Sequence, residues 1–355
     1  MHFAFTDDQL LFRDAVRDLL DKQCQAPQLR HAWAAGNGRL PEVWAALAEM
    51  GVVGIQVPEA SGGLGLTELD FVLLLEHSGR VGLPDPLVET AAVAAPMLAQ
   101  LATLSSGSLR SVADEWLPRI ADGSAVVAVS LDGSPLVSHA TNADLVVVAE
   151  NQTLWLVTGD DVTAIAQPSI DGARDVATIS WDRDRAVRAD SELMTDELSA
   201  VIAAGQDRGA LGSAAQLIGL AQTMLDMTVD YVQQRQQFGV PIGSFQAVKH
   251  HLADAALRLE FARPVVYAAA YAVAMGESTA SRSVAHAKSA ASDAAALVGR
   301  HALQCHGAIG YTVEYDLHLY LKRVWALAAS WGDAAYHRGR IAEFVLGPVP
   351  FSEST

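Results

Sequence analysis

Residues 235–246, RQQFGVPIGSFQ, decide the fold, because they form a short connection between two long helical patterns. Apolar residues recur at helical spacing on both sides of this stretch and in two further patterns downstream. The four patterns cover residues 198–235, 245–275, 278–305 and 317–346. Long helices with short connections are typical of a four-helix bundle, which we expect over residues 195–355.

Upstream of the bundle the period of the apolar residues changes twice. In the first third, Thr6 precedes Asp7 and Asp8 as an N-cap with acids in the first helical turn, and further helical patterns follow. The middle holds five short β-branched or alternating runs separated by Gly, Asp, Asn and Pro, which predict a small sheet. The fold class expected is therefore mostly α with a small β domain. Its units are an N-terminal helical domain at 1–122, a reduced middle β domain at 123–194 and the bundle.

Composition excludes several classes of function. A net charge of -17 without a Lys/Arg-rich run argues against a nucleic-acid partner. The two cysteines, Cys24 and Cys305, form no CxxC pair, and the adjacent His250 and His251 point about 100° apart on a helix, so no metal site is predicted. The N-terminal acids do not fit a signal peptide, and no long apolar run is free of charge. We expect a cytoplasmic chain with no membrane span.

Two C-terminal segments carry residues suited to a nucleotide. In the first, Arg235 can pair with a diphosphate and Phe238 offers a flat face to an adenine ring. In the second, Gly307 and Ala308 let a backbone approach a ligand closely, and Gln304 can hydrogen-bond a phosphate or ribose. Taken alone, each segment is explained equally well as a corner between two helices.

Together the two segments resemble the acyl-CoA dehydrogenase family. The matching patterns are RxxFGxPIGxFQAVKHxLAD and QxxGAIGYTxEYxLHxYLKR. The N-terminal FTDDQLLFRDAVRDLL and GVVGIQVPEASGGLGL are also similar to that family's opening helices and loop. The resemblance, which includes the helix–sheet–helix order, covers nearly the whole chain.

The resemblance implies FAD as cofactor and an acyl-CoA thioester as substrate, oxidised to the trans-2-enoyl-CoA with electron-transferring flavoprotein as acceptor. It also implies that the C-terminal motifs hold the adenosine-diphosphate half of a neighbouring subunit's FAD. The cofactor-binding residues carried over by position are Arg235, Phe238, Gln246, Gln304, Gly307 and Ala308.

The catalytic base of the family is missing from this sequence. Counting seventeen residues from Glu314, where the family has a Glu-Gly-Thr segment, lands on Trp331. The alternative family position, at the start of the first bundle helix, holds Gly209. An indole cannot accept a proton, so we predict no catalytic residue in this chain. Asp207 and Asp333 are the nearest carboxylates, and Asp333 is a weak candidate base.

The flavin-facing segment is altered as well, since residues 129–134 read VSLDGS where the family has Thr-Glu-Pro followed by Gly-Ser-Asp. A chain that keeps the clamp for a neighbour's FAD but lacks a base resembles the shorter subunit of heteromeric α2β2 acyl-CoA dehydrogenases. In actinobacteria such enzymes act on steroid side-chain CoA thioesters, as in cholesterol degradation. Two alternatives stay open at this point. One is a self-sufficient homo-oligomer with an unconventional base, and the other is a scaffold pseudoenzyme without a redox role.

Overall fold

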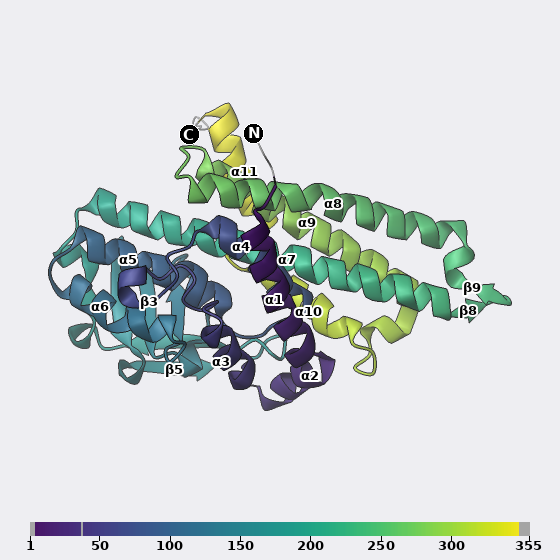
Figure 1. Ribbon diagram of the computed structural model, residues 1–355, viewed down its shortest axis with the longest axis horizontal. Helices are drawn as coiled ribbons and strands as arrows, with labels where there is room; N and C mark the ends of the chain where they lie inside the picture. The colour runs from purple at the N-terminus through teal and green to yellow at the C-terminus, as the bar shows by residue number, and fades with distance from the viewer. Residues whose placement is uncertain (1–3, 37, 348–355) are drawn as a thin grey trace, which may run out of the picture.

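The computed structural model describes residues 4–36 and 38–347, and its order is helical unit, β layer and helical bundle (Figure 1). The outermost residues of the expected first and third units, 1–3 and 348–355, lie outside the described part. The helices of the first unit are α1 (Asp7–Gln23), α2 (Ala26–Ala35), α3 (Pro41–Glu49), α4 (Glu68–Arg80), the π-helix η2 (Leu87–Ala94), α5 (Ala95–Leu104) and α6 (Ser108–Ala121). Short 3₁₀ turns are η1 (Glu59–Ser61), η3 (Ala140–Asn142), η4 (Gly159–Asp161), η5 (Arg183–Arg185) and η6 (Ala189–Ser191).

Local sequence explains where α1 begins. The Thr6 side chain accepts a hydrogen bond from the backbone N–H of Gln9, and the Gln9 side chain accepts one from the Thr6 N–H, which is a capping box. Asp7 and Asp8 lie in the first turn, near the positive end of the helix dipole. The predicted helix start at Thr6 is confirmed.

The β layer contains two small sheets, where one was expected. Its strands are β1 (Val127–Ser130), β2 (Val137–Ser138), β3 (Leu145–Glu150), β4 (Thr153–Thr158), β5 (Val162–Ala166), β6 (Val176–Trp181) and β7 (Val187–Arg188). One sheet has the order β1-β3-β4-β7, with β1 and β3 parallel, and the other has the order β2-β6-β5. The two-residue strands β2 and β7 carry too little sequence pattern to reveal this division.

The bundle consists of α7 (Thr195–Gln234), α8 (Gln246–Ala274), α9 (Ala280–His306), α10 (Leu317–Ala329) and α11 (Ala334–Leu346). The continuous pattern expected over residues 317–346 was wrong, because residues 330–333 break it into two helices. Trp331 and Gly332 have φ of 57° and 84°, in the left-handed region where a right-handed helix cannot continue. The break places the side chain of Trp331 beside α7.

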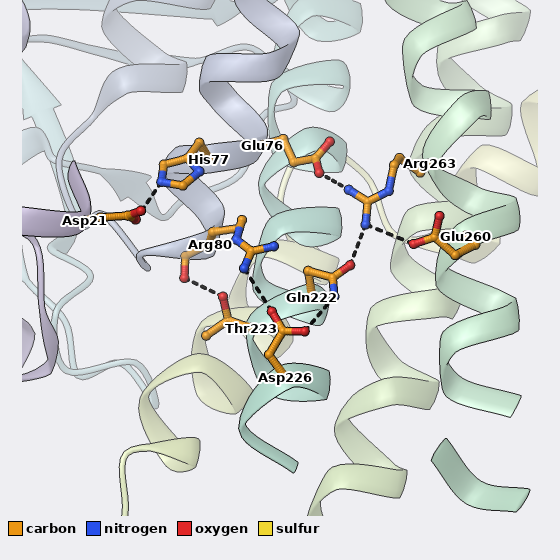
Figure 2. Close-up of polar contacts among 9 residues, drawn as sticks. All are labelled: Asp21, Glu76, His77, Arg80, Gln222, Thr223, Asp226, Glu260 and Arg263. Atoms are coloured by element: carbon orange, nitrogen blue, oxygen red, sulfur yellow. Dashed lines mark hydrogen bonds and ion pairs between the residues drawn. The ribbon is translucent and has the colours of Figure 1, made fainter. Parts of the chain in front are cut away.

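Glycines bring α4 of the first unit against α7 of the bundle. A Cβ added at Gly79 would overlap the backbone of Gln216, and one added at Gly219 would overlap the backbone of Glu76. The two helices therefore touch backbone to backbone, and their polar side chains meet α8 in the cluster of Figure 2. One continuous apolar core runs through the first unit, the bundle and part of the β layer.

Within residues 4–36 and 38–347, one segment, Leu87–Leu104, is long and apolar enough to cross a membrane by length and composition. It is 61% buried inside the fold, and residues such as Val93 and Leu98 are inaccessible to solvent. Helices in the core of a globular protein can be equally long and apolar, and the burial of this segment is typical of such a helix.

Candidate functional site

The first predicted clamp segment projects from the end of α7 as a small hairpin, β8 (Gln236–Gln237) with β9 (Val240–Pro241) (Figure 1). Phe238 and Gly239 form its tip with φ of 54° and 80°. The Phe238 ring is 94% exposed. Arg235, the C-cap of α7, is also exposed and makes no ion pair with any described residue. The Phe238 ring meets the Phe245 ring edge to face, with centroids 6.1 Å apart, and stays open to solvent. The exposed guanidinium and the exposed ring are therefore available to a ligand from outside the chain.

The second segment lies where α9 ends. Gly307 terminates the helix with φ 64°, and the turn η8 (Gly307–Tyr311) follows. Gln304, Gly307 and Ala308 are all exposed on this corner. At Gly307 an added Cβ would meet nothing within 4 Å, so the backbone there is open to a close approach.

The two segments lie at the same end of the bundle. The rings of Tyr231, one turn before Arg235, and His306, at the end of α9, stack with centroids 4.3 Å apart. Gln246 is the first residue of α8 and is exposed just beyond the hairpin. The expected cofactor-binding side chains are therefore solvent-facing and grouped, an arrangement that fits the adenosine-diphosphate half of a dinucleotide such as FAD.

The two positions at which a base was sought meet in space. The indole of Trp331 lies directly on Gly209 of α7, and a Cβ added at Gly209 would overlap the six-membered part of the ring. The loop is held in place because His337 Nε2 donates to the Trp331 carbonyl at 2.9 Å. The indole therefore fills the space into which a carboxylate from either position would project.

The two nearby carboxylates are already engaged. Asp333 is the N-cap of α11 and accepts from the backbone N–H of Tyr336 at 2.8 Å. Asp207 pairs with Arg340 at 2.9 Å. Both carboxylates contact α11, Asp333 as its N-cap and Asp207 through Arg340. The candidate base Asp333 is therefore engaged in a capping hydrogen bond.

A hollow of about 410 Å³ lies beside Trp331, between the β layer and α10. Its wall includes Ser130 and Asp132 of the altered flavin-facing segment, and also two residues that sequence reasoning missed, Glu89 and Arg174. Burial raises the pKa of the Glu89 carboxyl, and the charge of Arg174 opposes that shift. Burial also lowers the pKa of Arg174, whose Nη2 donates to Ser330 Oγ at 2.8 Å.

One signal in the sequence could have drawn attention to Glu89. It is the lone acid in the apolar segment 87–104, and it lies in the π-helix η2. A π-helical turn is rare and is frequent at functional sites. Arg174 carries no comparable signal, because its place in the hollow depends on how the sheets pack on α10.

We expect Gly209→Ala to lower the free energy of unfolding by about 1–3 kcal/mol, because the added methyl group overlaps the indole of Trp331. In a Trp331→Ala background the same change should cost almost nothing. Gly339→Ala is the matched control, since it replaces another helical glycine but meets nothing within 4 Å. Urea denaturation of the four variants measures this coupling, and additive effects of the Gly209 and Trp331 changes would contradict the packing described.

Comparison with protein families matches both helical parts of the chain. The acyl-CoA dehydrogenase N-terminal domain matches residues 6–124, and the acyl-CoA dehydrogenase C-terminal domain matches residues 200–346.

Individual relatives agree with these matches. The chain is 33% identical to the acyl-CoA dehydrogenase IpdE2 of Mycolicibacterium smegmatis over 92% of its own length and 95% of the relative's. It is 32% identical to IpdE2 of Mycobacterium tuberculosis, over 89% and 91%. Among solved structures, the ChsE4-ChsE5 complex from Mycobacterium tuberculosis is similar with a TM-score of 0.85, 24% identity and coverage of 98% and 100%. Butyryl-CoA dehydrogenase from Megasphaera elsdenii gives 0.86 and 22%, with the same coverage.

Proposed function

The chain belongs to the acyl-CoA dehydrogenase family of FAD flavoproteins, and we propose that it is the non-catalytic subunit of a hetero-oligomeric member. In this proposal it contributes the interface clamp for FAD, and a homologous partner subunit supplies the catalytic carboxylate. The fold class expected from the sequence is confirmed, and FAD is confirmed as the cofactor of the family.

The observation that carries the proposal is the contact of Trp331 with Gly209. Removal of the α-proton of an acyl thioester needs a side chain that accepts a proton within hydrogen-bond reach. The indole offers only an N–H donor, and it occupies the space where either base would lie. A chain with this indole in place of a base can still contribute its exposed dinucleotide clamp to an enzyme whose other subunit has its own base.

The proposed role of the clamp follows from its exposed groups. The chemistry that FAD would supply when bound is acceptance of the hydride from the β-carbon of the acyl group. The Arg235 guanidinium would pair with the diphosphate and the Phe238 ring would stack on the adenine, both at the end of the bundle. Gln246, Gln304 and the open backbone at Gly307 would orient the same half of the cofactor.

The proposed partner and substrate are inferred from two similar solved structures. One similar solved structure is a ChsE4-ChsE5 complex and another is a Tcur3481-Tcur3483 steroid acyl-CoA dehydrogenase, at 24% identity each. We therefore propose an α2β2 heterotetramer that oxidises a steroid side-chain CoA thioester, as in cholesterol degradation, with electron-transferring flavoprotein as acceptor. Its proposed location is the cytoplasm.

We expect Arg235→Ala to weaken retention of FAD by the assembled enzyme by about 1.5–3 kcal/mol, the range for a lost charge-assisted contact. Arg282→Ala, which removes an arginine at the start of α9, is the control. Flavin release followed by fluorescence during dialysis measures the effect. An unchanged affinity in Arg235→Ala would place the clamp elsewhere.

Glu89 is the observation that favours a second candidate, a self-sufficient dehydrogenase with an unconventional base. It faces the hollow beside Trp331, and burial raises its pKa, which makes the ionised carboxylate a stronger proton acceptor than an exposed one. If the chain alone turns over an acyl-CoA and Glu89→Gln abolishes that turnover, this candidate replaces the first.

A further inference from the structure

A second hollow, of about 460 Å³, lies among α1, α4 and α8, and residues of the polar cluster in Figure 2 line it. Arginines from all three helices line it: Arg13 and Arg17 of α1, Arg80 of α4 and Arg263 of α8. The convergence of four guanidinium groups is notable in a chain with a net charge of -17. Figure 2 shows two of these arginines, with His77 on the same helix as Arg80.

The carboxylates in the wall do not balance the arginines. Asp21 and Glu76 are the acidic residues that line the hollow, so its wall carries two more positive than negative charges while His77 is neutral. Burial raises the pKa of Glu76, although Arg263 opposes the shift. The remaining ion-pair partners, including Asp14 and Asp226, have side chains 40% and 48% exposed, where solvent screens them.

The guanidinium groups also carry more N–H donors than their ion pairs use. An arginine has five N–H donors. Among the described residues, the side chain of Arg80 contacts only Asp226, through Nη2 at 2.9 Å. In the described part of the chain, the side chain of Arg13 pairs with its neighbour Asp14 alone, and that of Arg17 pairs with Asp14 and Asp18. Donors from separate helices are therefore left to meet a shared acceptor.

We propose that this arginine hollow binds a phosphate group, either free or carried by a nucleotide. A phosphate dianion offers oxygens in several directions, which matches donors arriving from three helices. A single carboxylate, in contrast, is satisfied by one arginine through two parallel hydrogen bonds. The volume also admits more than one phosphate, because pockets of about 300–1,000 Å³ accommodate small-molecule ligands.

His77 is a reporter built into the site. Its Nε2 lies 2.8 Å from Asp21 Oδ1. Burial lowers the pKa of His77; the contact with Asp21 opposes this shift, and the charges of Arg80 and Arg17 add to it. A phosphate bound between those arginines would offset their charge, so binding should move the pKa of His77 upward. A merely structural ion-pair network would not respond to phosphate in this way.

The test is titration of the 355-residue chain with inorganic phosphate and separately with ADP, at an ionic strength held constant with sodium chloride. NMR of labelled histidine follows the ring of His77, assigned by its loss in His77→Gln. We expect saturable binding of phosphate and an upward shift of the His77 pKa. Tighter binding of ADP would identify a nucleotide as the source of the group, and equal binding would identify free phosphate.

Arg80→Gln and Arg17→Gln are the informative variants, because each breaks only exposed ion pairs, whereas Arg263 holds the buried Glu76. Each should weaken phosphate binding at least about tenfold. Arg110→Gln, which removes an exposed arginine paired with Asp114 on α6, should leave it unchanged. The proposal is overturned by the absence of a saturable response, by an equal response to acetate or chloride, or by wild-type binding in both hollow variants.

Discussion

Asp333→Asn and Glu89→Gln in this chain are expected to leave the turnover of the assembled enzyme unchanged. Converting the base carboxylate of the partner subunit to its amide should lower turnover by about 10²–10⁴-fold, the usual contribution of general base catalysis. Asparagine caps a helix as well as aspartate does, so Asp333→Asn keeps the hydrogen bond from the Tyr336 N–H. The variant therefore removes a proton acceptor without loosening α11.

Steady-state assays of the co-purified enzyme with an acyl-CoA substrate measure this contrast, with flavin absorbance confirming that each variant still holds FAD. The pH profile adds a second readout, because a base in this chain would shift the acidic limb when Asp333 or Glu89 is changed. A loss of turnover in Glu89→Gln, with the flavin retained, would place the chemistry in the hollow beside Trp331.

Lys288→Met is expected to change how stability depends on pH. Lys288 is fully buried, and its Nζ donates to the carbonyls of Leu327 and Ala328, in the last turn of α10, at 3.0 and 3.1 Å. The Leu327 carbonyl also accepts from the backbone N–H of Ser330 at 3.2 Å. The cation satisfies carbonyls at the end of α10 and complements the helix dipole there. Burial nevertheless lowers the pKa of Lys288 to about 7, and Asp333 opposes the shift.

The lowered pKa fixes the sign of the effect. Between about pH 7 and the ordinary lysine value, the unfolded chain holds a proton on Lys288 that the folded chain has released. Stability therefore rises with pH across this window, and the cost of burying the charge is fully present below it. Relative to Lys288→Met, the wild type should gain on the order of 4 kcal/mol between pH 6 and pH 10. Urea denaturation across this range, with exposed Lys22→Met as control, measures the difference; parallel curves would contradict it.

The local elements were the part of the fold that the sequence predicted well. Thr6 as a cap, the five principal strands and the long bundle helices all have short-range signals in cap residues or apolar period. The exposure of Phe238 also follows locally, since a Phe-Gly tip between two long helices has no core to enter. Features decided within about ten residues of chain are accessible to such reasoning.

The site itself depends on contacts between distant parts of the chain. The loss of the base could be counted from Glu314, but the contact of Trp331 with Gly209 joins the break between α10 and α11 to the distant helix α7, and no periodicity reveals it. The break at residues 330–333 was missed for a related reason, because apolar spacing continues through it while the backbone turns at Trp331 and Gly332.

Both hollows show the same dependence on packing. Glu89 and Arg174 come from η2 and from the loop before β6, and they meet only after the sheets dock on α10. The arginine hollow combines α1, α4 and α8, whose separation in sequence hides any charge cluster. In the sequence each arginine of this group stands near an acid, as on an ordinary solvated helix face.

The proposal that a partner subunit supplies the base is tested most directly by the mass and flavin content of the purified protein, alone and co-expressed with a homologous acyl-CoA dehydrogenase subunit as the candidate partner. We predict a colourless or inactive chain alone and a yellow α2β2 assembly with half as many FAD molecules as chains. A yellow homotetramer of this chain that turns over acyl-CoA without a partner would contradict the account, because its base would then lie in this chain despite Trp331.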